Sequence, residues 1–280
     1  MEFIEITSDN AEDFSAYIDE DMADDLDRVF FRGIGALEGG SPVGAIVYEL
    51  KDSENEDDTK SRIHVLGGES DEIKGRLIEE YKKGLAEDEV LESFYETGDE
   101  ILAGILEKNG FSSSQVEGPE IEVTIEDIKK LISVLKITRF PEHIQSISGL
   151  SLLQYRTFIK NCLFKGRHGI CEDLSYLSKN WFEPDVSSCA VIDEKVEGML
   201  LLKKTPSGKL IPQLYVDLGP DSKKDLLFLL AHTCVKTVEM YPADTKVIIR
   251  RHNDSVRNLT NKLIAGRKGD MVFFGTRNEG

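Results

Sequence analysis

The chain has 280 residues, of which 40% are hydrophobic and 31% charged, a composition typical of globular proteins with an ordinary apolar core. Its length suits two domains of about 140 residues better than a single one. No run of about 18 apolar residues is present, which excludes a membrane-spanning helix. The acidic beginning, MEFIEITSDN, lacks the basic and apolar segments of a secretion signal. We therefore expect a cytoplasmic protein.

The net charge of −18 is distributed unevenly along the chain. Residues 1–130 contain 36 acidic and 12 basic side chains, whereas the remainder contains 16 acidic and 22 basic ones. Because nucleic acids and anionic lipids are polyanions, the acidic first half is expected to repel both, and neither is expected as a partner. The same surface would tolerate a cationic amine, although such acidity also serves solubility alone.

The four cysteines, Cys162, Cys171, Cys189 and Cys234, all lie in the second half. None belongs to a Cys-x-x-Cys pair, and no His-x-x-x-His motif accompanies them. This spacing argues against a structural zinc site and against a disulfide framework. We expect free thiols that pack as small apolar side chains, and we expect no metal site.

Hydrophobic periodicity and turn residues predict alternating helices and strands in the first half. In chain order we expect a strand, a helix, a two-stranded hairpin, a third strand, a long helix, a fourth strand, a short helix and a last strand, over Phe3–Ile6, Ala11–Leu26, Gly33–Leu37 with Val43–Leu50, Ser61–Leu66, 71–86, Val90–Tyr95, Glu100–Asn109 and Ile121–Thr124. Gly39 and Gly40 are expected to form the hairpin turn, and Gly110 is expected to end the short helix in the left-handed conformation. The polar stretch 112–119 is expected to connect the last two elements.

The second half repeats this order of elements. Here we expect two helices, a hairpin, a third strand, a long helix, a fourth strand, a short helix and a closing strand, over Leu152–Leu163, Glu172–Asn180, Ser187–Ile192 with Val196–Lys203, Leu210–Val216, Lys223–Tyr241, Val247–Arg251, Val256–Ala265 and Met271–Gly275. Matching positions recur at nearly one spacing, namely Gly44 with Gly198, Val65 with Val216 and Gly110 with Gly266. Such a spacing favours an internal duplication. The predicted organisation is a first domain over 1–125, a linker helix over 126–148 and a second domain over 149–280.

Four segments carry a family resemblance. They are the hairpins GALEGGSPVGAIVYEL (Gly35–Leu50) and CAVIDEKVEGMLLLKK (Cys189–Lys204), the helix ending GDEILAGILEKNGF (Gly98–Phe111), and HNDSVRNLTNKLIAG (His252–Gly266). Together with the order of elements, they resemble the GNAT superfamily of acyl-CoA N-acyltransferases in a tandem, two-domain form. The resemblance implies a mixed α/β fold in which each domain has a central, mostly antiparallel sheet flanked by helices.

The resemblance also locates the acyl-CoA site, at the turn between the third strand and the long helix. In the family this strand separates from its neighbour so that its backbone amides pair with the pantetheine arm, and a Gln/Arg-x-x-Gly-x-Gly/Ala loop holds the pyrophosphate at the helix N-terminus. Neither half keeps that loop. The first half carries Glu69, Asp71 and Glu72 at this place, and since acids oppose phosphate, we interpret it as a degenerate module.

The second half is closer to a working acetyl-CoA site. The resemblance implies that Leu214 and Val216 lie on the strand that pairs with pantetheine, and that Asn253 matches an asparagine characteristic of the family. Asp221 or Ser222 can cap the long helix, and Lys223 and Lys224 can neutralise a pyrophosphate without the glycines. The alternative is that the two lysines are ordinary solvated surface charges.

The catalytic signature of the family is incomplete. The tyrosine that often protonates the departing thiolate is replaced by Leu106 in the first half, and its place falls near Asn261 or Lys262 in the second. A base that deprotonates the attacking ammonium must lie within hydrogen-bond reach of it. The candidates are three residues of the second half, Tyr215, Asp217 and Glu197, each of which can instead be a solvated or structural residue. For His64, His143 and His232 we expect packing or surface roles.

The sequence therefore predicts an N-acyltransferase that transfers an acetyl group from acetyl-CoA to a primary amine by direct attack. The acceptor is expected to be a small-molecule amine or a peptide N-terminus. The alternative is a catalytically silent scaffold with a GNAT-like fold that binds a metabolite or a protein partner. The missing glycine loops and tyrosines favour the alternative, and the two lysines favour the enzyme.

Overall fold

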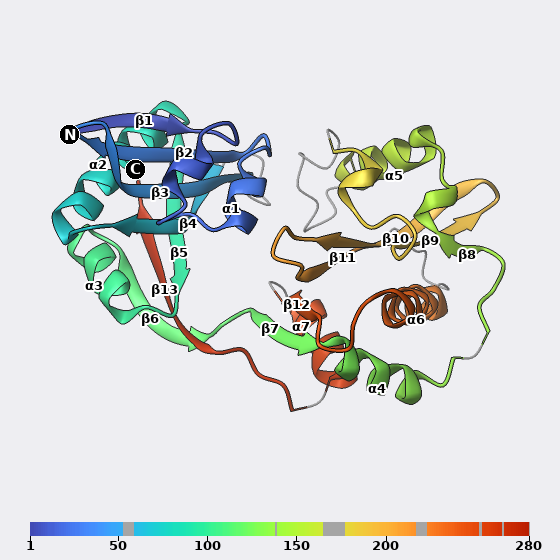
Figure 1. The fold of residues 1–280 in the computed structure, drawn as a ribbon. Helices are drawn as coiled ribbons and strands as arrows, with labels where there is room; N and C mark the ends of the chain where they lie inside the picture. The colour runs from blue at the N-terminus through green and yellow to red at the C-terminus, as the bar shows by residue number, and fades with distance from the viewer. Residues whose placement is uncertain are drawn as a thin grey trace. The chain divides into compact units, whose positions relative to one another are not determined.

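A computed structural model describes residues 1–52, 59–137, 139–164, 177–216, 223–251, 254–264 and 266–279 and divides the chain into two compact units (Figure 1). Unit 1 comprises Met1–Gly118 together with Asp270–Gly280, and unit 2 comprises Pro119–Gly269. Each unit contains one mixed sheet covered by helices. The predicted α/β class is therefore confirmed. No helix in the described part of the chain is long and apolar enough to cross a membrane.

The sheet of unit 1 is antiparallel except for one parallel pair among its described strands, β4 with β5. Its strand order is β1-β2-β3-β4-β5-β13-β6. The strands are β1 (Glu2–Ile6), β2 (Phe31–Glu38), β3 (Ser41–Asp52), β4 (Thr59–Gly68), β5 (Val90–Thr97), β6 (Ser112–Glu117) and β13 (Met271–Asn278). Gly39 and Gly40, at φ of 60° and 85°, form the expected turn between β2 and β3.

Helices cover both faces of this sheet. The long helix α2 (Asp71–Glu87) and α3 (Glu100–Lys108) pack on one face, whereas the 3-10 turn η1 (Ala11–Phe14) and α1 (Glu20–Asp25) pack on the other. Strand β3 is consequently buried on both sides: Ile46 and Tyr48 belong to the core under α2, and Ala45 and Val47 to the core under η1 and α1. Phe14 packs so closely on β2 that a Cβ at Gly35 would lie 2.2 Å from its ring.

One expected helix of unit 1 is broken. The segment 11–26 forms η1 and the short α1 in place of a continuous helix, and the side chain of Asp19 caps α1 by accepting a hydrogen bond from the amide of Met22. Asp19 favours this break because its side chain satisfies the helix start locally. The other predicted helices are confirmed, with Ser70 capping α2 and Asp99 capping α3.

Unit 2 has the same plan, with described strands in the order β7-β12-β11-β10-β9-β8. The strands are β7 (Glu120–Thr124), β8 (Ile144–Ser146), β9 (Ser188–Ile192), β10 (Lys195–Lys204), β11 (Leu210–Val216) and β12 (Lys246–Arg250). The helices are α4 (Ile125–Leu135), α5 (Leu152–Phe164), α6 (Lys223–Met240) and α7 (Asp254–Leu263), with 3-10 turns η2 (Ile147–Gly149) and η4 (Lys179–Trp181). Of these strand pairs, only β11 and β12 run parallel. The helix expected at Glu172–Asn180 lies largely outside the described residues, and its described end forms η4.

The division of the chain differs from the predicted boundaries at 125 and 149. Strand β7 pairs with β12, and α4 packs against α6, so the expected linker 126–148 is an integral part of unit 2. The closing strand β13 belongs to unit 1, where it lies between β5 and β6. The polar stretch 112–117, expected as a connection, is the strand β6. Because β6 has almost no apolar alternation, its pairing with β13 decides its conformation.

Candidate functional site

The parallel strands β11 and β12 of unit 2 separate soon after they meet. They pair at Leu210 and Val247, while β11 continues to Val216 and β12 to Arg250. The resemblance to the GNAT superfamily implies that the third strand separates from a neighbour in this way. A ligand in this opening could bind only those backbone groups of β11 that point toward it.

The hydrogen bonds of β10 and of the turn that follows it show the direction of these backbone groups. The amide of Thr205 donates to the carbonyl of Lys209 at 2.8 Å. Because hydrogen-bonded positions alternate along an antiparallel pair, the backbone N–H and C=O groups of the odd-numbered residues of β11 point toward β10. Leu202, which lies opposite Pro212, instead donates its N–H to Ser187 Oγ at 2.9 Å and accepts from the amide of Glu183 at 2.8 Å, on the side of β9. Alternation therefore directs the backbone of the even-numbered residues of β11 away from β10.

We call the outward edge of Pro212, Leu214 and Val216 the open edge. Leu214 and Val216 each present an N–H and a C=O there, whereas Pro212 presents only a C=O. These are the two residues that the sequence assigned to pantetheine pairing. Tyr215, in contrast, directs its backbone to β10, where it lies opposite Met199.

The candidate base Glu197 lies on β10, across from the end of β11. The register of β10 with β9 shifts between Val196 and Gly198, which makes Glu197 the extra residue of a β-bulge, and Gly198 lies opposite Val216. Bulges redirect a side chain and are frequent beside functional sites. The Glu197 side chain is half-buried. The structure thus brings Glu197, Leu214, Tyr215 and Val216 to one end of two neighbouring strands.

The remaining predicted site residues follow β11 and β12 in the chain. Lys223 and Lys224 are the first two residues of α6, as expected. Asp217 and Ser222 lie outside the described residues, as does Asn253, which precedes the first residue of α7. No group of three or more histidine, cysteine or acidic side chains in the described ranges is arranged to hold a metal ion.

Unit 1 has an equivalent opening between β4 and β5. Their pairing ends at Ile63 and Tyr95, whereas the strands continue to Gly68 and Thr97. Because the amide of Glu69 donates to the carbonyl of Val43 on β3, alternation turns Leu66 and Gly68 toward the opening.

The side chain of Tyr17 packs against the end of β4 in unit 1. A Cβ at Gly67 would lie 3.2 Å from the Cβ of Tyr17, so the glycine accommodates that side chain. Burial and the neighbouring carboxylate of Glu69 raise the pKa of Tyr17. Helix α2 then begins with Asp71 and Glu72, behind the cap of Ser70. The start of α2 is therefore already satisfied by negative charge, which disfavours a pyrophosphate.

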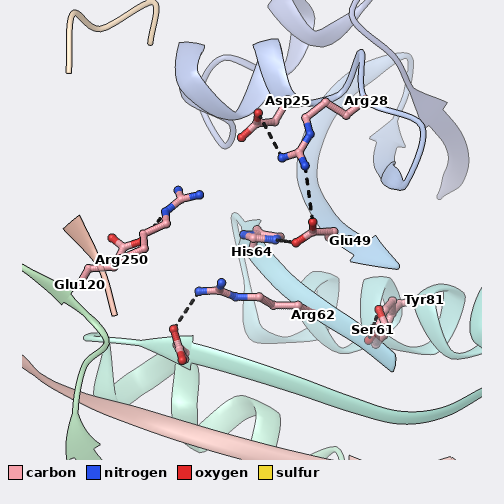
Figure 2. A network of polar contacts seen from close by, with 10 residues as sticks. Asp25, Arg28, Glu49, Ser61, Arg62, His64, Tyr81, Glu120 and Arg250 are labelled. Atoms are coloured by element: carbon pink, nitrogen blue, oxygen red, sulfur yellow. Dashed lines mark hydrogen bonds and ion pairs between the residues drawn. The ribbon is translucent and has the colours of Figure 1, made fainter. Parts of the chain in front are cut away.

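A polar network lies on the α1 side of the same sheet (Figure 2). His64 Nε2 lies 3.1 Å from the buried carboxylate of Glu49, and its ring stacks on Phe31 at 5.2 Å. Arg28 contacts both Glu49 and Asp25, at 3.9 and 3.7 Å, and its guanidinium lies over the Phe31 ring. Sequence reasoning missed this network, because its members come from distant segments that only the sheet brings together.

His64 is also the point at which β4 changes register. The partners of β3 jump from Ile63 to Val65 between Tyr48 and Val47, which leaves His64 as a bulge residue. Nearby, Arg62 donates to Glu96 across β4 and β5 at 2.8 Å. The network therefore holds α1 and the two separating strands together by charge and hydrogen bonding. The packing role expected for His64 is fulfilled with a polar partner.

In unit 2, His232 on α6 forms a buried polar pair with β9. Its Nδ1 lies 2.6 Å from Ser188 Oγ, which also contacts Thr233 Oγ1 at 2.7 Å, and Phe140 packs edge-on against the ring. Burial lowers the pKa of His232, and the charge of Lys236 lowers it further. The neutral imidazole is thus part of the core, as the sequence indicated.

This arrangement predicts a pH-dependent stability of unit 2. The unfolded chain protonates His232 below about pH 6.5, whereas the folded state keeps the imidazole neutral to lower pH, so stability present at neutral pH is lost as the pH falls through this interval. Urea unfolding at pH 7.5 and 5.5 can be followed by Trp181, the single tryptophan, which lies in unit 2. We expect His232→Asn to reduce the loss of stability between the two values. An unchanged loss would contradict this role of His232.

The two sheets, each opened between its parallel strands and covered by helices on both faces, define a tandem GNAT fold. A search of solved structures supports this class. The tandem GNAT protein from the clavulanic acid biosynthesis pathway, solved without acetyl-CoA, is similar over 100% of this chain and 98% of its own, with a TM-score of 0.68 and 13% identity.

Two further structures show the same similarity at lower scores. A GCN5-related N-acetyltransferase from Sphaerobacter thermophilus matches over 99% of this chain and 96% of its own, with a TM-score of 0.55 and 11% identity. A conserved protein of unknown function from Enterococcus faecalis V583, described as a probable N-acyltransferase, matches over 99% and 72%, with a TM-score of 0.53 and 11% identity. No protein-family model and no curated protein matches the sequence. At these identities the likeness establishes the fold.

Proposed function

We propose that the chain is an N-acyltransferase whose second unit binds acetyl-CoA along the open edge of β11. The observation that carries the proposal is the direction of the β11 backbone: Leu214 and Val216 direct their backbone donors and acceptors away from β10, where β11 leaves β12. A pantetheine arm is an extended chain with two amides, and it can pair with such an edge as a further strand would.

The start of α6 supports an anion at the end of this edge. Lys223 and Lys224 occupy the first turn of an 18-residue helix, where the helix dipole disfavours cations. In unit 1 the corresponding helix begins with acids, which the dipole favours. The two lysines are therefore unfavourable at this helix start, although Asp225 in the same turn offsets part of their charge, and a bound pyrophosphate would offset the rest.

The proposed reaction is direct transfer. The lone pair of a primary amine attacks the thioester carbonyl carbon, and the C–S bond breaks. The nitrogen gives up one proton to form the amide, and the CoA thiolate leaves and takes up one proton. Before attack, a base removes one proton from the ammonium. The candidates are Glu197, Asp217 and Tyr215, of which Glu197 is supported by its bulge position beside Val216. The acceptor is a small-molecule amine or a peptide N-terminus, and unit 1 has a supporting role.

Calorimetric titration with acetyl-CoA tests the proposal. We expect the wild-type chain to bind, and the Lys223→Glu/Lys224→Glu variant to bind about 30-fold more weakly, because two favourable charges become unfavourable. The same variant should unfold at a higher temperature, since glutamates suit the helix start. Loss of affinity together with gained stability cannot arise from misfolding.

A matched control reverses two adjacent lysines elsewhere in unit 2. Lys129 and Lys130 are exposed on α4, and Lys129→Glu/Lys130→Glu makes the same change in net charge. We expect it to retain the affinity for acetyl-CoA. If the wild-type chain shows no heat and no thermal shift with millimolar acetyl-CoA or longer acyl-CoAs, the enzyme proposal fails and the silent scaffold remains. Release of free thiol with a panel of amines then identifies the acceptor class.

A further inference from the structure

Strand β11 contains a proline in its interior. Pro212 follows Ile211 within a run that otherwise reads as an ordinary apolar strand, and it is half-buried. Proline has no backbone N–H, so it removes one donor from a strand ladder and is normally confined to sheet edges. The consequence depends on which neighbour the missing N–H would have reached.

The missing donor would have faced β12. The backbone of Pro212 turns away from β10, as its partner Leu202 shows. On the other strand, the amide of Arg251 donates to the carbonyl of Pro119 at 2.9 Å, on the side of β7. By alternation, the even-numbered residues Ile248 and Arg250 turn their backbones toward β11.

A parallel ladder between β11 and β12 would continue from Leu210 in a defined way. The next bond would run from the N–H of residue 212 to the carbonyl of Ile248, followed by a bond from the amide of Arg250 to the carbonyl of residue 212, and one from the amide of Leu214 to Arg250. The first of these bonds cannot form with proline. The pairing of the two strands stops at this step, with Leu210 and Val247.

In unit 1 the parallel pairing of β4 with β5 is also interrupted, but by a β-bulge instead of a proline. Gly44 on β3 lies opposite Gly68, and the matching Gly198 on β10 lies opposite Val216. His64 lies four residues before Gly68, and Pro212 lies four residues before Val216, so the two residues occupy matching positions in their strands. His64 is the bulge residue of β4, and the parallel pairing with β5 ends directly before it. The two units thus interrupt their parallel ladder at one position, by a bulge in unit 1 and by a proline in unit 2.

We propose that Pro212 is the positioning residue that keeps the acyl-CoA groove of unit 2 open. Because proline has no backbone N–H, the hydrogen bond that would continue the pairing of β11 with β12 cannot form. The identity of the groove's ligand rests on the function proposed above, whereas the effect of Pro212 on strand pairing does not. In this role Pro212 leaves the amides of Leu214 and Val216 available to a ligand. It need not touch the reacting atoms.

Hydrogen exchange of the ligand-free protein tests the proposal. In Pro212→Ala the N–H is restored, and we expect the amides of Arg250 and Leu214 to exchange about tenfold more slowly, as for amides that gain a ladder bond. The amide of Tyr215 is an internal reference, because its backbone faces β10, opposite Met199, and gains no bond to β12. Pro242→Ala, at an exposed position after α6, controls for the loss of a proline ring.

The ligand arm is measured separately with acetyl-CoA. We expect Pro212→Ala to bind about tenfold more weakly than the wild type, because the ligand must first displace the new strand pairing, while Pro242→Ala binds normally. Faster or unchanged exchange at Arg250 and Leu214 in Pro212→Ala would overturn the role of Pro212. Slower exchange in a protein whose wild type binds no acyl-CoA would uphold that role and overturn only the proposed ligand.

Discussion

Removal of residues 270–280 is expected to unfold unit 1 and to leave unit 2 folded. Strand β13 lies inside the sheet of unit 1, where Phe273–Asn278 pair with β5 and Met271–Thr276 pair with β6. Each lost ladder bond costs about 1 kcal/mol net. The total is comparable to the roughly 5–15 kcal/mol that stabilises a whole domain. Unit 2, in contrast, is one continuous segment, Pro119–Gly269, which contains every strand described for its sheet.

Peptide-resolved hydrogen exchange and tryptophan fluorescence separate the two outcomes. In the shortened chain, amides of β4, β5 and α2 should lose protection, while Trp181 should keep a cooperative transition. A control chain keeps β13 but carries a few extra glycine and serine residues between α7 and β13. Because doubling a loop costs only about 0.6 kcal/mol, this control should remain folded in both units. Full protection of β5 in the shortened chain would refute the role of β13.

A single methyl group at Gly275 is expected to destabilise unit 1 by about 3 kcal/mol, at the upper end of the cost of overpacking. Gly275 pairs with Tyr95 on one side and Ser113 on the other. A Cβ there would lie 2.3 Å from Tyr95 Cε1 and 2.7 Å from the carbonyl of Ser112, distances that real Cβ atoms essentially never show. Tyr95 is 1% exposed and cannot swing out of the way.

Two comparisons make this prediction specific. Gly104 lies in α3, where a methyl group added to its Cα would have no described neighbour within 4 Å, so Gly104→Ala should stabilise the protein by up to about 1 kcal/mol. Tyr95→Leu should recover part of the loss when combined with Gly275→Ala, which a double-mutant cycle by urea unfolding measures. Additive effects of Gly275→Ala and Tyr95→Leu would show that the clash is not the cause.

Most helices and strands follow from local sequence. Apolar runs separated by the Gly39-Gly40 turn mark β2 and β3, and capping residues mark α2 and α3. The end of α3 also follows from local sequence, because Gly110 adopts the expected positive φ, 97°. The matching Gly266 adopts a φ of 84°. Such features depend on residues close in the chain, and the resemblance of the two halves was therefore visible as well.

The register in which neighbouring strands pair was harder to predict from the sequence. The landmark that matched Val65 with Val216 is displaced, because the residue opposite Gly44 is Gly68, whereas Val216 lies opposite Gly198. A bulge adds one residue to a strand without any clear mark in its sequence, and His64 is such a residue. The signal that could have been used was Pro212, since an interior proline indicates a strand edge.

The sequence by itself determined the two α/β modules, the strands of the candidate site, and the contrast between the acids at the start of α2 and the lysines at the start of α6. These depend on periodicity, caps and charge, which are local properties. Only the tertiary structure decided that the last strand completes the sheet of unit 1, and that Leu214 and Val216 face an open edge. Both depend on which strands become neighbours, and the pairing of residues far apart in the chain is a property of the whole sheet.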